Sequence, residues 1–172
     1  MKLLKTLFLF LAMMYAGNSY AQTKEETIEW LNRNGKSMIE TLFIIDNKLV
    51  SPSIYFLFDN IVKDTISFRV QSNDDHYKEH RWRDIDIPLG SILYQDVNSL
   101  VKTTFTKNSD YGYFAIQLLP NSGYVKGGEY NYHISTFYFP YKKTNEENAK
   151  RVIKAIMHLA KLSGAKENKQ TF

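Results

Sequence analysis

The densest group of possible metal ligands in the chain is the segment Asp74–His80, DDHYKEH. On a helix, His76 and His80 would lie one turn apart on the same face and could bind Zn²⁺ or Cu²⁺. The segment begins with turn residues, however, and lies between two predicted strands, which indicates a solvated loop. We therefore predict no metal site and no cofactor.

Arg81, Trp82 and Arg83 follow this loop at the start of a predicted strand. Successive side chains of a strand point to opposite faces, so alternation groups Trp82 with Asp84 and Asp86 on the outer face. An exposed Trp between two Arg residues could anchor a binding partner. In the alternative interpretation, the Trp ring lies over the sheet and the Arg stems cover its rim.

The segment Asn121–Tyr132, NSGYVKGGEYNY, is rich in glycine and tyrosine. Tyr124, Tyr130 and Tyr132 could project from a mobile loop and contact sugar or peptide, as tyrosines do in binding loops. The segment could equally be a long hairpin connection. It does not match a phosphate-binding loop, because it contains no Gly-Lys-Ser/Thr and no predicted helix follows it.

The sequence carries no recognisable catalytic motif. It contains no Cys, no Gly-x-Ser-x-Gly and no His-Glu-x-x-His. We therefore expect a protein that is not an enzyme, and a hydrolase is only the third of our functional hypotheses.

The first 21 residues have the layout of a secretory signal peptide. Lys2 and Lys5 precede the apolar run Thr6–Gly17, and Ser19-Tyr20-Ala21 places small side chains where cleavage requires them. The run is too short to span a bilayer, which takes about 20 apolar residues. We expect cleavage after Ala21, a mature chain that starts at Gln22 and does not span the membrane, and a periplasmic or secreted location.

The charge of the expected mature chain excludes one class of partner. The whole sequence has a formal net charge of +4, and two of its basic residues lie in the leader. A balance so close to neutral gives no electrostatic argument for nucleic acid. Aromatic residues make up 15% of the chain, which fits the half-buried surfaces of β-sheets.

Hydrophobic residues alternate with a period of two through most of the mature chain, which predicts seven short strands. The expected strands are Met38–Asp46, Ile54–Asp59, Thr65–Gln71, Arg81–Ile87, Val101–Thr106, Tyr113–Leu119 and Tyr132–Phe139. Their short connections favour an antiparallel meander curled into a barrel or a sandwich. We expect one domain over residues 22–166 and a frayed tail over 167–172.

Two helices flank the predicted strands. Thr23 and Glu26 match a capping box, and the first helix is expected to continue to about Asn34 and to end at Gly35. A second capping box at Thr144–Glu147 begins an amphipathic helix that ends at Gly164. Its apolar stripe must pack on the sheet, and it comprises Ala149, Val152, Ile153, Ile156, Leu159, Ala160 and Ser163.

This α+β order of a short helix, a seven-strand meander and a C-terminal amphipathic helix resembles the pleckstrin-homology-like (PH-like) architecture. The stretches Thr23–Asn32 and Ala149–Lys166 are also similar to a group of small exported bacterial proteins of uncharacterised function. The final helix lacks the Trp of true pleckstrin homology domains, so the resemblance implies a fold rather than an activity.

Two hypotheses from different classes follow. The first is an exported binding domain whose surface contacts an as yet unknown protein, peptide or envelope component, with Arg81, Trp82, Arg83, Tyr124, Tyr130 and Tyr132 as candidate contacts. The alternative is a small barrel that carries an apolar ligand. A filled core with an exposed aromatic patch favours the first hypothesis, and a deep apolar cavity favours the second.

Overall fold

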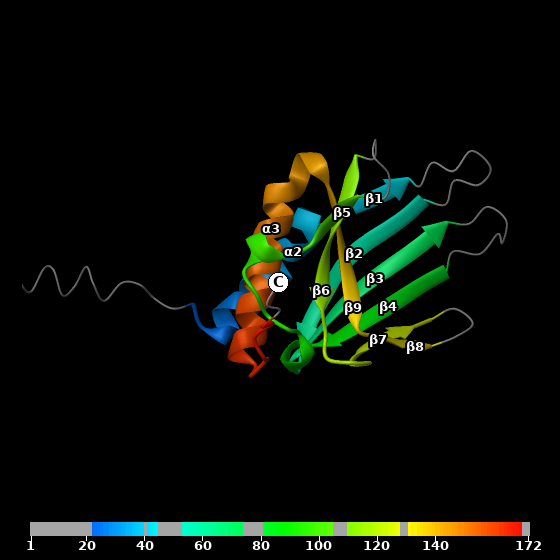
Figure 1. The fold of residues 1–172 in the computed structure, drawn as a ribbon. Coiled ribbons are helices and arrows are strands. Elements are labelled where there is room, and N and C mark those ends of the chain that lie inside the picture. The colour runs from blue at the N-terminus through cyan, green and yellow to red at the C-terminus, as the bar shows by residue number, and fades with distance from the viewer. Residues whose placement is uncertain are drawn as a thin grey trace, which may run out of the picture.

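The computed structural model describes residues 22–39, 41–44, 53–73, 81–104, 110–127 and 131–169. Two antiparallel sheets pack against each other, and two helices lie side by side along them (Figure 1). The helices are α2 (Lys24–Ile39) and α3 (Glu146–Leu162). The expected signal peptide over residues 1–21 and the segment with His76 and His80 lie outside the described residues.

The larger sheet has six strands in the order β1-β2-β3-β4-β7-β8, and the smaller sheet has three in the order β5-β6-β9. The strands of the larger sheet are β1 (Thr41–Ile44), β2 (Ser53–Val62), β3 (Thr65–Asn73), β4 (Arg81–Pro88), β7 (Gly123–Lys126) and β8 (Tyr132–Ile134). The strands of the smaller sheet are β5 (Lys102–Thr104), β6 (Tyr111–Gln117) and β9 (Thr136–Lys142).

The predicted α+β class with antiparallel strands and two flanking helices is confirmed, but the predicted simple meander is wrong. β4 pairs with β7 and β6 pairs with β9, so neighbours in each sheet are not always neighbours in sequence. Among the described strands, no pairing joins the two sheets into a closed barrel.

The expected strand Tyr132–Phe139 is divided at Ser135, where the chain passes from the larger sheet to the smaller one. The Ser135 carbonyl accepts a hydrogen bond from the Leu118 N–H (2.9 Å), and its hydroxyl accepts one from the Asn121 N–H (2.9 Å). These two contacts hold the corner, which alternation in the sequence does not reveal.

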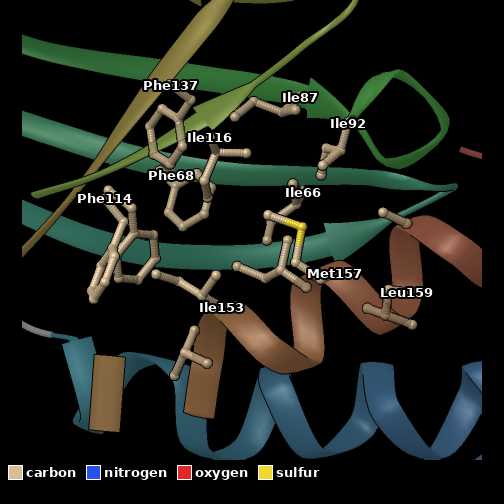
Figure 2. Close-up of a cluster of buried hydrophobic side chains, with 14 of the residues drawn as sticks. Ile66, Phe68, Ile87, Ile92, Phe114, Ile116, Phe137, Ile153, Met157 and Leu159 are labelled. Carbon is tan, nitrogen blue, oxygen red and sulfur yellow. The ribbon is translucent and has the colours of Figure 1, made fainter. Parts of the chain in front are cut away.

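The core lies between the sheets and α3, and Phe68 of β3 is at its centre (Figure 2). The Phe68 ring stacks on Phe137 of β9 at 4.7 Å and meets Phe139 edge-on at 6.0 Å. Ile153 and Met157 of α3 reach toward it from the helix side (Figure 2). Side chains from both sheets and from α3 therefore meet in one packed cluster.

The predicted apolar stripe of α3 is confirmed, since every expected position from Ala149 to Ala160 is buried, and Met157 is buried with them. Gly164 follows the helix with φ +79°, as the left-handed end requires. The predicted capping box at Thr144 is wrong, because a 3₁₀ turn over Lys143–Asn145 precedes the helix. Asn145 instead donates its side-chain N–H to the carbonyl of Met38 (2.9 Å) and ties the start of α3 to the end of α2.

The capping box of α2 is confirmed: the Glu26 N–H donates to Thr23 Oγ1 (3.2 Å), and the Thr23 N–H donates to Glu26 Oε2 (2.8 Å). The predicted end at Gly35 is wrong, because α2 continues through it to Ile39. A Cβ at position 35 would lie 2.9 Å from Cδ1 of Phe58. Position 35 therefore requires glycine because β2 approaches it closely, and not because the helix ends there.

The chain after α3 is tied to the sheets, which differs from the frayed tail expected over residues 167–172. The Tyr94 N–H donates to the Lys166 carbonyl (3.0 Å), and the Asn168 N–H donates to the Tyr94 carbonyl (2.9 Å). Residues 170–172 lie outside the described part of the chain. Within that part, no helix combines the length and the apolar character that crossing a membrane requires.

We predict that Ile156→Asp lowers the free energy of unfolding by roughly 3–5 kcal/mol, because it places a carboxylate in the core. Lys154→Asp, on the exposed side of the same helix, should cost less than about 1 kcal/mol. Urea unfolding of both variants is the measurement. Equal midpoints would contradict the packing of α3.

We also predict that Gly35→Ala destabilises the protein by about 1 kcal/mol or more, because the new methyl group would overpack the Phe58 ring. The same change in an open helix interior stabilises by about 1 kcal/mol. In a Phe58→Leu background the penalty should shrink, which a double-mutant cycle in urea measures. If Gly35→Ala were more stable than the wild type, the Phe58 ring would have to shift without an energetic penalty, which would contradict this prediction.

Candidate functional site

The two long strands of the smaller sheet carry aromatic residues on both faces. Phe114 and Ile116 of β6 and Phe137 and Phe139 of β9 are buried against the larger sheet. The intervening positions of both strands belong to the opposite, outer face. We call this outer face the tyrosine face, and it comprises Tyr111, Tyr113, Ala115, Tyr138 and Pro140.

The register of β6 and β9 sets the geometry of the tyrosine face. Tyr113 pairs with Pro140, and Ala115 pairs with Tyr138. The rings of Tyr113 and Tyr138 meet edge-on with their centroids 5.0 Å apart. The side chain of Tyr138 is 57% exposed, whereas Ala115 and Pro140 are buried. The tyrosine rings therefore form the accessible part of this face.

The ends of the tyrosine face are polar. At one end, the Thr136 hydroxyl donates to Oε1 of Gln117 (3.1 Å). At the other end, Lys142 is exposed and pairs with Tyr111. A tyrosine offers a broad apolar ring and a hydroxyl that can donate or accept a hydrogen bond, and it loses little side-chain entropy on binding. An apolar centre with polar ends is the composition of a contact surface.

The outer face of the larger sheet carries a second feature, a charged ladder across β3, β4 and β7. The Ser67 hydroxyl donates to Oδ1 of Asp86 (2.7 Å), and Nζ of Lys126 donates to Oδ2 of the same carboxylate (2.5 Å). One residue pair further along, Nε of Arg69 donates to Oδ1 of Asp84 (2.8 Å). The expected outward position of both aspartates in β4 is confirmed.

The charges of the ladder stabilise one another's ionised forms. Burial opposes ionisation of Asp86, but the hydrogen bonds from Lys126 and Ser67 outweigh it, so the pKa of Asp86 lies below its usual value. The hydrogen bond to Asp86 raises the pKa of Lys126, and the hydrogen bond to Asp84 raises the pKa of Arg69. The carboxylate of Asp86 therefore favours its ionised form and is unsuited to act as a general acid.

The first group of predicted contact residues lies in β4. The backbones of Arg81 and Trp82 pair with Ser72 and Gln71 of β3, and their side chains lie outside the described residues. Arg83 is exposed. It pairs with Val70, on the face opposite Asp84. Arg83 therefore does not join the charged ladder.

The predicted tyrosine group is divided. The segment expected to be a loop forms the β7–β8 hairpin instead. Tyr124 lies on the face of the charged ladder, with its ring 5.0 Å from the His133 ring and 5.5 Å from Nζ of Lys126. Tyr132 pairs with Val125 on the other face and is 45% exposed. Tyr130 lies outside the described residues.

The residues that the sequence analysis missed are Tyr111, Tyr113 and Tyr138. Their signal was present as tyrosines at alternate positions of YGYFAIQ and as Tyr138 between the two buried phenylalanines of TFYFPYK. A strand with one wet face normally carries polar residues there, so tyrosines at these positions mark an unusual face. Their union into one face depends on the β6–β9 pairing, which joins distant parts of the sequence.

Groups suited to metal binding or acid–base catalysis do not gather at these features. Among the residues described by the structure, there is no cluster of three or more His, Asp or Glu side chains that could hold a metal ion. What the described surfaces present is an aromatic face and a paired set of charges.

Comparison of the chain with models of protein families, with curated proteins and with solved structures finds no match. Its function must therefore be argued from the geometry of the described surfaces.

Proposed function

We propose that the protein is an exported, non-catalytic binding domain that contacts a protein, peptide or envelope component through the tyrosine face. The observation that carries the proposal is the exposure of Tyr138 beside Tyr113 on the outer side of a sheet whose inner side is fully packed. Exposed aromatic groups of this kind mark interaction sites.

The energetics of the tyrosine face support binding over a purely structural role. Tyr138 is more than half exposed, so its ring contributes little to the core. If a partner covered the ring, further apolar area would be removed from water at about 25 cal/mol per Å². The rigid sheet beneath it also limits the entropy lost on binding, because β9 is paired along its length with β6.

The interior gives less support to the alternative of an apolar-ligand carrier. A carrier needs a cavity between its sheets, whereas here Phe68, Phe137 and Phe139 occupy that space in direct ring contact. Figure 2 shows the same region filled from the sheets and from α3. A hydrolase is less favoured still, because the ladder carboxylates are engaged in ion pairs.

The finer fold assignment belongs to the same proposal. A PH-like architecture is supported by the strongly paired antiparallel strands and by an amphipathic C-terminal helix that packs its apolar stripe into the core. The exported location is supported by the layout of residues 1–21. The sequence contains no Cys. Such a domain rests on packing alone, with no disulfide to strengthen it.

We predict that Tyr138→Ala removes capture of the partner by tagged mature protein in a pull-down from the native cell envelope. The variant should unfold within about 1 kcal/mol of the wild type, because the ring is largely exposed. Tyr132→Ala, an exposed tyrosine in β8, is the matched control and should capture normally.

The Trp82→Ala variant tests the competing contact surface on β4 in the same pull-down. If capture depends on Trp82 and survives Tyr138→Ala, the contact surface lies on β4 and the assignment to the tyrosine face is wrong. Full capture by both variants would reject both sites.

We predict that the exported protein begins at Gln22, because Ser19 and Ala21 fit the small-residue positions of a cleavage site. Intact-mass spectrometry of the protein recovered from the native host measures this directly. Recovery of a chain that retains Met1 would contradict the proposed export and processing.

A further inference from the structure

A groove of about 460 Å³ lies between α2 and α3, away from the tyrosine face and from the charged ladder. Its lining consists of Gln22, Trp30, Arg151, Lys154, Ala155 and His158. The α3 residues recur at steps of three and four and so share one side of that helix. The other side of α3 carries the buried stripe, so the groove uses the helix face that the core leaves free.

The floor of the groove is apolar and fixed in place. Trp30 is half-buried and packs against the core, and Ala155 packs there from the other helix. Because Trp30 both lines the groove and packs against the core, its indole offers an aromatic surface there.

The charge of the groove is of one sign. Three of the lining residues are basic, counting His158, and none is acidic. Arg151 and Lys154 are exposed and form no ion pair with any residue in the described ranges, although several lysines elsewhere do. This arrangement attracts an anion.

Three carboxylates of the two helices have partners of their own. Glu147, one turn before Arg151, accepts a hydrogen bond from Nζ of Lys150 (2.6 Å). On α2, Glu26 accepts from the backbone of Thr23 (2.8 Å). Glu29 forms an ion pair with Arg33. Glu147 and Glu29 are thus each paired with a basic side chain, and no acidic residue lines the groove.

His158 closes one end of the groove. Its Nε2 lies 2.8 Å from the backbone carbonyl of Gln22. A carbonyl oxygen can only accept, so Nε2 carries the proton and donates. The contact holds the chain before α2 against α3 and gives the groove a defined rim.

We propose that this groove binds a small organic acid, with its carboxylate between Arg151 and Lys154 and its flat apolar body on Trp30 and Ala155. The volume lies in the range of small-molecule sites. The fork of the arginine side chain matches both oxygens of a carboxylate, which a lysine then approaches as a point charge. The inference does not depend on the tyrosine face and adds a second class of ligand.

The test is titration of the mature protein with 3-phenylpropionate, followed by the indole N–H resonance of Trp30 in a Trp82→Phe background. We expect saturable binding, with affinity at least about tenfold weaker for the uncharged amide, 3-phenylpropanamide. The double variant Arg151→Gln/Lys154→Gln should lose at least about tenfold in affinity as well. Lys36→Gln/Lys143→Gln removes the same charge from exposed positions outside the groove and should bind as the wild type does.

Three results would overturn the proposal. The first is equal binding of the acid and the amide, and the second is unchanged affinity in the Arg151/Lys154 variant. The third is no saturable shift of the Trp30 resonance up to about 10 mM ligand, the weak end of specific recognition. If phenyl phosphate binds more than about tenfold tighter than the carboxylate, the assignment of a carboxylic acid is wrong and the groove selects phosphate esters.

Discussion

The contact of the Phe68 ring with β9 is the interaction on which the rest of the structure depends. Phe68 belongs to the larger sheet, and it touches Phe58 of the neighbouring strand and both phenylalanines of β9 in the smaller one. Each sheet alone would leave one apolar face in water, and α3 can cover only part of it. Stacking across Phe68 fixes which face of β9 is internal, and it thereby fixes the tyrosines on the outside.

The parts of the fold that could be predicted from the sequence are those set by local periodicity. Ile66 and Phe68 alternate with polar residues in β3, and the structure buries both of them. The stripe of α3 is equally local, since its members lie one turn apart. In these elements the chain's own pattern and its tertiary packing require the same faces, so the pattern alone was sufficient.

The failures arise where a distant residue decides a local conformation. Gly35 has the appearance of a helix end, but its role depends on the Phe58 ring, which comes from another element. The corner at Ser135 depends on backbone contacts to Leu118 and Asn121. The prediction of the candidate site failed for the same reason, because Tyr113 and Tyr138 become neighbours only through the pairing of β6 with β9. The sequence predicts the two outward carboxylates of the charged ladder. It does not predict their ion pairs, because the basic partners come from β3 and β7.

The presence of aromatic rings on both faces of β9 has a consequence for the folding of the chain. A slip of one residue against β6 would expose Phe137 and Phe139 and would turn Thr136, Tyr138 and Lys142 inward instead. The observed phase also places Gly112 opposite Tyr141, where any Cβ would lie 2.9 Å from the Tyr141 ring. The corner at Ser135, held by its contacts with Leu118 and Asn121, fixes this phase. A deletion or insertion of one residue there would reverse the phase and would turn the charge of Lys142 toward the interior.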